Sequence, residues 1–241
     1  MTRRVLLGAA CVILITSCAA KNRDQAFFDE MSQMSKDEVF ARGEALFGDK
    51  KWEEARRYFS FLADSFPNDP VGRRASLRVA DSFFQRKDVE SLTEAQLRYR
   101  DFSNRFPNDS GRPYALSMLG KCSLQQSKGP LRDLAPIREA AESFRQVVEL
   151  YPDSPHAPEA RELLARCLAD LAEHEFQVAR YYFNIHAWSG ARMRLQHLVS
   201  TYPDTEAAQR GKELLRQIEE KVSGDTAGEA PTPTPTPAGN P

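Results

Sequence analysis

The stretch SFPNDP (65–70) decides the fold, because close variants of it recur along the chain. RFPNDS occupies 105–110, LYPDSP occupies 150–155 and TYPDTE occupies 201–206. Their prolines lie 40, 45 and 51 residues apart. A phrase that returns at this spacing indicates one supersecondary unit used several times in succession.

The residues before each phrase follow a fixed apolar pattern. An alanine stands twelve residues before each proline, a large apolar residue follows it four positions later, and an aromatic residue directly precedes the proline. These offsets return to one side of a helix with about 3.6 residues per turn, so they predict an amphipathic helix before each phrase. The alanines are Ala55, Ala95, Ala140 and Ala191, and the large residues are Phe59, Tyr99, Phe144 and Leu195.

Each phrase also contains the signal that starts the next helix. Proline biases its predecessor away from the α region, which ends the preceding helix. Two positions later stands a residue that caps helix N-termini well, namely Asp69, Asp109, Ser154 or Thr205. The capping box Ser35-Lys36-Asp37-Glu38 predicts the start of the first helix. Each unit is therefore predicted to be a helical hairpin.

The frame resembles the tetratricopeptide repeat. Gly43, Leu46, Ala55, Phe59 and Pro67 fall at its small, large, small, aromatic and proline positions. This resemblance implies an all-α, tetratricopeptide-like superhelix of helical hairpins (an α-solenoid), with about five repeats and a terminal capping helix from Thr205. We expect repeats 1 and 2 over 35–107, an irregular repeat 3 over 108–153, and repeat 4 with the capping helix over 154–222.

The N-terminal segment is of a different kind. Arg3 and Arg4 precede an apolar run of eleven residues, which is typical of a secretory signal and too short for a membrane span. The run ends in Ile-Thr-Ser-Cys at 15–18, which resembles the lipobox of bacterial lipoproteins. That resemblance implies a signal peptide over 1–17 and a mature N-terminal Cys18 that carries S-diacylglyceryl and N-palmitoyl groups. The alternative is an ordinary signal peptide with an incidental cysteine.

Two further segments lie outside the predicted repeats. Residues 18–34 are interpreted as the lipidated N-terminus and a polar tether. Residues 223–241 contain alternating Thr-Pro, which cannot form a helix or a central strand, and are interpreted as a disordered tail. In the lipoprotein class, Ala19 and Ala20 after the cysteine imply sorting to the outer membrane, with the body facing the periplasm.

The composition and motifs argue against catalysis and nucleic-acid binding. The net charge of −1 and a pI near 6.5 do not fit a nucleic-acid partner. Paired metal-binding histidines, Cys-x-x-Cys and phosphate-cradling glycine loops are missing from the sequence. We therefore expect a non-enzyme without catalytic residues, cofactor or metal. Cys122 and Cys167 lie in Ala- and Leu-rich helical stretches, which favours two buried thiols over a disulfide.

The stretch after the third phrase is unusual for a plain repeat. Its predicted first helix, 158–187, is about twice the usual length and ends in a crowd of aromatic residues. The plain interpretation of these aromatics is core. Adjacent Tyr181 and Tyr182 cannot both point inward equally, so one of them is a candidate for a contact surface.

The same stretch resembles the C-terminal part of the BamD (ComL-like) family of outer-membrane protein assembly lipoproteins. The matching residues are Glu175, Val178, Ala179, Tyr181, Tyr182, Ala187, Trp188, Arg194 and the Tyr-Pro-Asp-Thr of 202–205. The lipobox and repeat layout agree, so the resemblance covers nearly the whole chain. It departs in GKCSLQQSKGPLRDLAP (120–136) and in the Thr-Pro tail.

The resemblance implies a non-catalytic subunit of the β-barrel assembly (BAM) machinery. The implied partners are the POTRA domain of a BamA-like barrel protein, other BAM lipoproteins, and the C-terminal segments of unfolded outer-membrane proteins, which the protein helps deliver and insert. Tyr181, Trp188 and Arg194 are the candidate partner interface, although Arg194 is equally interpretable as a solvated helix charge. A Tol–Pal or other cell-envelope scaffold lipoprotein, or a pilotin for a pilus secretin, stays open as an alternative.

Overall fold

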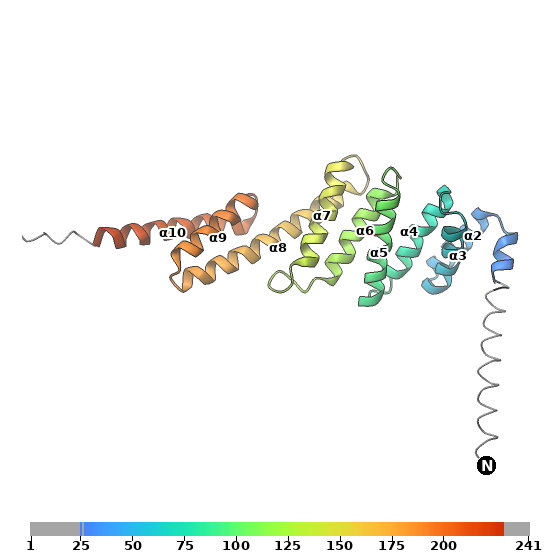
Figure 1. Ribbon diagram of the computed structural model, residues 1–241, viewed down its shortest axis with the longest axis horizontal. Helices are drawn as coiled ribbons and strands as arrows, with labels where there is room; N and C mark the ends of the chain where they lie inside the picture. The colour runs from blue at the N-terminus through green and yellow to red at the C-terminus, as the bar shows by residue number, and fades with distance from the viewer. Residues whose placement is uncertain (1–24, 26, 229–241) are drawn as a thin grey trace, which may run out of the picture. The chain divides into compact units, whose positions relative to one another are not determined.

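A computed structural model describes residues 25 and 27–228, with side chains to residue 221. Within these residues every regular element is a helix (Figure 1). The all-α, tetratricopeptide-like fold of helical hairpins is confirmed. The helices are α2 (Lys36–Gly48), α3 (Trp52–Ser65), α4 (Pro70–Phe84), α5 (Val89–Arg105), α6 (Arg112–Gln126), α7 (Ala135–Leu150), α8 (Ala157–Asn184), α9 (Trp188–Thr201) and α10 (Glu206–Gly228).

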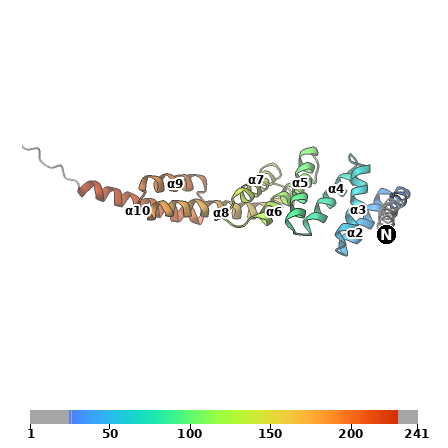
Figure 2. The same cartoon turned by 60° about the horizontal axis from the view of Figure 1, so that its bottom comes forward.

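The helices form two compact units, each with its own hydrophobic core. Unit 1 contains the described residues up to Gln126 together with the turn Leu150–His156. Unit 2 contains residues 127–149 and the chain from Ala157 onward. In unit 2, helices α8, α9 and α10 pack against one another as a group of three (Figure 2).

The proline phrases end and start helices as predicted. Phe66, Phe106 and Tyr202, which precede the prolines, share one backbone conformation outside the helical region, with φ/ψ of −134/52°, −125/64° and −129/52°. After the prolines, Asp69 accepts a hydrogen bond from the backbone N–H of Val71 (2.8 Å). Thr205 Oγ1 accepts one from Ala208 N–H (3.2 Å). The predicted capping box of Ser35 and Glu38 is also formed.

The predicted apolar pattern forms the cores. The alanines and the large residues four positions after them are all fully buried. This follows from close packing, because a small residue on one helix allows its neighbour to approach and a large residue fills the space beside it. The residues concerned are Ala55, Ala95, Ala140, Ala191, Phe59, Tyr99, Phe144 and Leu195, each with 0% exposure.

The second repeat owes its long period to its helices and not to the connection between them. That connection is short, because α4 ends at Phe84 and α5 already begins at Val89 behind the cap Asp88. Helix length supplies the extra residues instead: α5 has 17 residues, compared with 13 in α2 and 14 in α3. The long first helix expected after the third phrase is confirmed, since α8 has 28 residues.

The predicted tether over 18–34 needs correction in its described part. Residues 27–33 are helical, and Met31 is 1% exposed within the core around Phe59. Phe27, Met31 and Met34 recur at spacings of four and three, which places them on one helix face that packs on unit 1.

The predicted tail also begins later than expected. Helix α10 continues to Gly228, past the expected end at 222, because the sequence offers no proline to stop it before Pro231. The signal peptide, Cys18 and residues 229–241 lie outside the described residues. No described helix has both the length and the apolar character that a membrane span requires.

Candidate partner-binding surfaces

The first candidate surface is the hairpin of α8 and α9. Its turn passes through His186, whose backbone is left-handed at φ 60°. Trp188 opens α9 and packs edge-on against Phe183 at 5.2 Å and His186 at 5.0 Å between ring centroids. Trp188 therefore packs within the hairpin tip and closes it, and its place in the interface stays a prediction.

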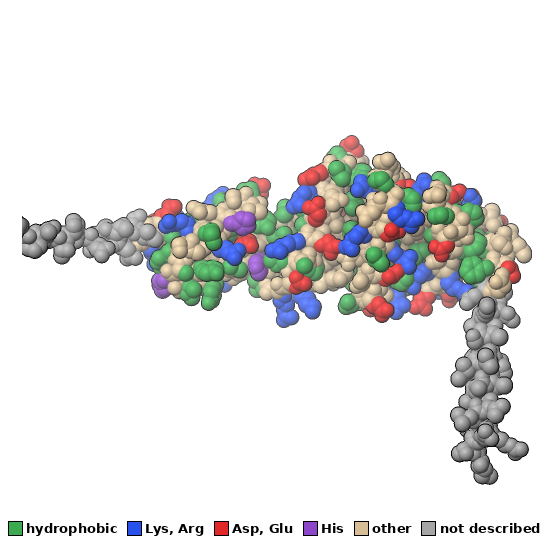
Figure 3. All heavy atoms as spheres, in the orientation of Figure 1, with side chains coloured by type: hydrophobic (Ala, Val, Ile, Leu, Met, Phe, Trp, Pro, Cys, Tyr) green, Lys and Arg blue, Asp and Glu red, His purple; other side chains and the backbone are tan. Residues whose placement is uncertain are grey.

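Tyr181 and Tyr182 face opposite environments, as predicted for adjacent residues. Tyr182 packs on Gly190, where an added Cβ would lie 3.1 Å from the tyrosine ring. Tyr181 is 63% exposed, and it is accompanied by Ile185 at 53% and Met193 at 65%. Tyr181, Ile185 and Met193 are called the hairpin apolar face below. Figure 3 shows hydrophobic side chains gathered at the lower left, where Figure 1 places the α8–α9 turn.

The hairpin apolar face is separate from the side on which α10 packs. Arg210 of α10 pairs with Glu173 and lies 4.3 Å from the ring centroid of Phe176. Tyr181, Ile185 and Met193 stay exposed although α10 packs on the same two helices.

Arg194 is held across the hairpin rather than free in solvent. Its Nη1 lies 3.3 Å from Oε2 of Glu175, which is largely buried on α8. Burial raises the pKa of nearby Tyr202, and the Glu175 carboxylate adds to that shift. One ion pair leaves most of the guanidinium donors of Arg194 for another acceptor.

The second candidate surface lies on the first helices of unit 1. A cavity of about 520 Å³ opens along α2, α4 and α6. Its apolar lining comes from Phe40, Leu77 and Tyr114, and its polar lining from Glu44, Arg74, Arg78 and Asp81. These seven residues are called the unit 1 groove below, and sequence reasoning named none of them.

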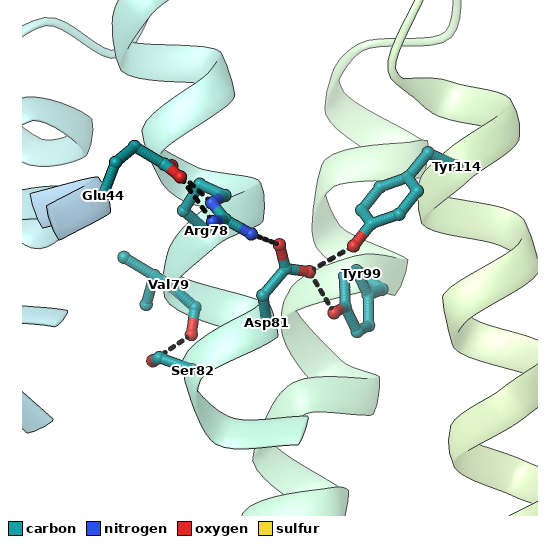
Figure 4. Close-up of polar contacts among 7 residues, drawn as sticks. All are labelled: Glu44, Arg78, Val79, Asp81, Ser82, Tyr99 and Tyr114. Atoms are coloured by element: carbon teal, nitrogen blue, oxygen red, sulfur yellow. Dashed lines mark hydrogen bonds and ion pairs between the residues drawn. The ribbon is translucent and has the colours of Figure 1, made fainter. Parts of the chain in front are cut away.

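The floor of the unit 1 groove is a polar network centred on Asp81 (Figure 4). Asp81 is 4% exposed, and its Oδ1 accepts hydrogen bonds from Tyr99 (2.6 Å) and Tyr114 (2.7 Å). Its Oδ2 lies 2.9 Å from Nη1 of Arg78, which also binds Glu44 through two bonds of 2.6 Å. A buried carboxylate with three donors is fully satisfied, so this floor is rigid.

The electrostatics of the network agree with that geometry. Burial raises the pKa of Tyr99 and Tyr114, and the Asp81 carboxylate raises both further. Burial alone would lower the pKa of Arg78, but its hydrogen bonds to Glu44 and Asp81 outweigh this and raise it. The tyrosines therefore stay neutral donors and Arg78 stays a cation over the whole physiological range.

Arg74 differs from Arg78 in having no ion pair among the described residues. It is exposed on α4, and its guanidinium carbon lies 4.6 Å from the ring centroid of Phe40. The groove thus presents one uncompensated cation beside apolar side chains. A sequence signal existed for the floor of this groove: an aspartate inside the apolar run LRVADSFF (77–84) is unusual unless it is paired.

Catalytic and metal chemistry find no support in the described residues. No group of three or more His, Cys, Asp or Glu there could hold a metal ion. Cys122 and Cys167 are buried and are not joined in a disulfide, which confirms that prediction. Burial raises the pKa of the Cys167 thiol to about 11, so this thiol is unreactive at neutral pH.

The fold defines a class: a helical-hairpin repeat protein, here with two candidate binding surfaces on its described residues. Comparison with known families places the chain within that class. Residues 32–230 match the family model YfiO, described as "Outer membrane lipoprotein". The chain belongs to this family of outer membrane lipoproteins.

Relatives agree with the family assignment at low identity. The chain is 24% identical to the outer membrane protein assembly factor BamD of Haemophilus influenzae, covering 88% of this chain and 82% of the relative. It is 23% identical to BamD of Vibrio cholerae, covering 89% of each. A solved structure of the MamA protein covers 83% of this chain and 98% of that one, with 12% identity and a TM-score of 0.38. The family description and these relatives' names confirm the prediction of a scaffold lipoprotein rather than an enzyme.

Proposed function

We propose that this protein is a non-catalytic assembly factor of the outer-membrane β-barrel assembly machinery. It helps deliver and insert unfolded outer-membrane proteins. The family match over 32–230 supports this, and so do the relatives named as assembly factors. The other subunits of that machinery, including its other lipoproteins, are then its partners.

Cys18 is the proposed membrane anchor. Its position after Thr16 and Ser17, at the end of the apolar run, supports acylation of its thiol and its amine. Stable attachment to a membrane takes two lipid signals or more, which a triacylated cysteine supplies. The body then faces the periplasm at the inner surface of the outer membrane.

The hairpin apolar face is the proposed docking surface for a POTRA domain of a BamA-like barrel protein. The observation that carries this is the joint exposure of Tyr181, Ile185 and Met193 on one hairpin, beside Arg194. Tyrosine, methionine and arginine are enriched where protein interfaces bury their centres. Trp188 supports this surface indirectly, because its packing against Phe183 and His186 fixes the turn between α8 and α9.

The unit 1 groove is the proposed holding site for the C-terminal segment of an unfolded client. Phe40, Leu77 and Tyr114 offer contacts for apolar side chains, and Arg74 offers a cation for a carboxylate. The satisfied network beneath them keeps the groove in one shape, which lowers the entropy cost of binding. Grooves on helical repeats commonly bind peptides in this way.

The test is affinity purification of the tagged, full-length lipoprotein from mildly solubilised membranes. We expect a BamA-like barrel protein to co-purify at stoichiometric amount with the wild-type chain. Tyr181→Ser combined with Arg194→Glu should abolish the co-purification. Leu97→Ser is the matched control, because Leu97 is 57% exposed on α5 of unit 1. Recovery of Tol–Pal or secretin components without the barrel protein would contradict the proposal.

A further inference from the structure

The loop 127–134, which precedes α7, presents an apolar residue between two cations. Leu131 is 67% exposed. Lys128 and Arg132, on either side of it, are also exposed, and neither has an ion pair within the described residues. This loop lies in the stretch where the sequence departs from the BamD family pattern, so the resemblance assigns it no role.

The loop is held in one shape by contacts along its length. Gly129 is left-handed at φ 95°, and its N–H donates to Ser127 Oγ at 3.1 Å. The Pro130 carbonyl accepts a hydrogen bond of 2.8 Å from Nδ1 of His174 on α8. Because a carbonyl can only accept, this bond places a proton on Nδ1 of His174. At the end of the loop, Leu134 is buried.

The hydrogen bond between His174 and the Pro130 carbonyl places the loop on the side of α8 that carries the hairpin apolar face. His174, Val178, Tyr181 and Ile185 follow one another at spacings of four, three and four, so they form one stripe on the helix. The stripe is about 17 Å long at the helical rise per residue. Both ends of the stripe therefore present exposed apolar side chains, Leu131 at one end and Ile185 at the other.

Positively charged side chains predominate along this face. Lys128 and Arg132 have no ion pair within the described residues, and Arg194 of α9 reaches Glu175, the residue after His174 on α8. Asp133 in the loop is engaged as a cap, accepting from Ala135 N–H at 2.9 Å. The acidic residue of the stripe, Asp170, lies one turn N-terminal to His174, on the side away from the tip.

We propose that loop 127–134 is a second contact element of the docking surface, so that one partner domain spans α8 from the hairpin tip to the loop. The partner surface opposite the loop is apolar with carboxylates on either side, because it must complement Leu131, Lys128 and Arg132. This inference rests on the proposed docking of a POTRA domain and adds where that domain makes its second contact.

The experiment measures binding of the full soluble body to the purified periplasmic POTRA domains of the BamA-like protein from the same genome. Leu131→Ser should weaken the affinity about tenfold, the loss typical of a truncated interface anchor. Lys128→Glu with Arg132→Glu should slow association and reduce its dependence on salt. His174→Ala should weaken binding like Leu131→Ser, whereas His174→Gln retains an N–H donor and should restore part of the affinity.

The controls separate this inference from the proposed function. Leu97→Ser should bind as wild type, and circular dichroism of each variant checks that the helices are intact. If Tyr181→Ser weakens binding and the loop variants do not, the second contact is wrong and the docking proposal survives. If the wild-type body does not bind the POTRA domains at all, the docking proposal itself fails.

Discussion

A Cβ atom added to Gly43 would lie 2.7 Å from Cε1 of Phe59. The two residues face each other across the α2–α3 hairpin, so the helices approach as closely as a bare glycine allows. Phe59 is fully buried and is surrounded by the core of unit 1. The ring therefore cannot move aside without disturbing that core.

Gly43→Ala should destabilise unit 1 although alanine is the better helix former. The helix preference favours alanine by about 1 kcal/mol, whereas overpacking a filled core costs about 1–3 kcal/mol. We expect a net loss in the free energy of unfolding, measured by urea denaturation. Gly48→Ala is the control, because an added Cβ there meets nothing within 4 Å. Equal stability of the two variants would refute the close approach.

Asp81→Ala should be among the most damaging single changes in unit 1. It leaves the Arg78 cation with one carboxylate partner and removes the acceptor of the buried Tyr99 and the half-buried Tyr114. Breaking a buried charge pair costs about 3–5 kcal/mol. Tyr114→Phe removes one donor and should cost about 1 kcal/mol. Asp64→Ala, an exposed aspartate on α3, should stay within about 0.5 kcal/mol of wild type. Chemical denaturation ranks the three, and a different order would count against the network.

Lys50→Gly and Lys87→Gly should each stabilise the chain. Both lysines occupy the left-handed region in turns between helices, with φ of 62° and 61°. A side chain there costs about 1–2 kcal/mol, partly offset by the greater backbone entropy that glycine loses on folding. A gain of about 0.5–1 kcal/mol is expected from thermal unfolding. Lys51→Gly, where φ is −84°, should bring no such gain.

Stability should fall at alkaline pH partly through Cys167. The pKa of its thiol is raised from 9.0 to about 11, so the folded chain holds this proton more tightly than the unfolded chain. The resulting contribution is fully present below pH 9 and is lost as the pH rises toward about 11. Cys167→Ala should flatten the pH dependence of the unfolding free energy in that window. An unchanged slope would show that the thiol does not contribute.

The repeat cores could be predicted from the sequence because they depend on local periodicity. Ala95 and Tyr99 are four residues apart on one helix, and that spacing alone places them on one face. The proline phrases carry their own stop and cap signals, so the hairpin boundaries followed from short stretches. These features need no knowledge of which helix packs on which.

The binding surfaces needed the tertiary structure. Asp81 meets Tyr99 and Tyr114 across sequence separations of 18 and 33 residues, which no local pattern encodes. Ile185 and Met193 have the residue types of core positions, and their exposure depends on which helices lie beside them. Of the predicted interface residues, Tyr181 and Arg194 lie at the surface, whereas Trp188 packs into the turn.

The burial of Met31 in the core of unit 1 limits how far unit 1 can lie from a lipid anchor at Cys18. With Cys18 acylated as proposed, seven peptide steps separate it from Gln25, the first described helical residue. A chain of that length spans at most about 25 Å, a little less than the thickness of one hydrocarbon core. The N-terminal end of unit 1 would then stay in a thin layer next to the membrane and would not reach through the depth of the periplasm. The unit 1 groove would meet only client chains that have already reached the outer membrane. Their encounter would then take place along the membrane surface, in two dimensions.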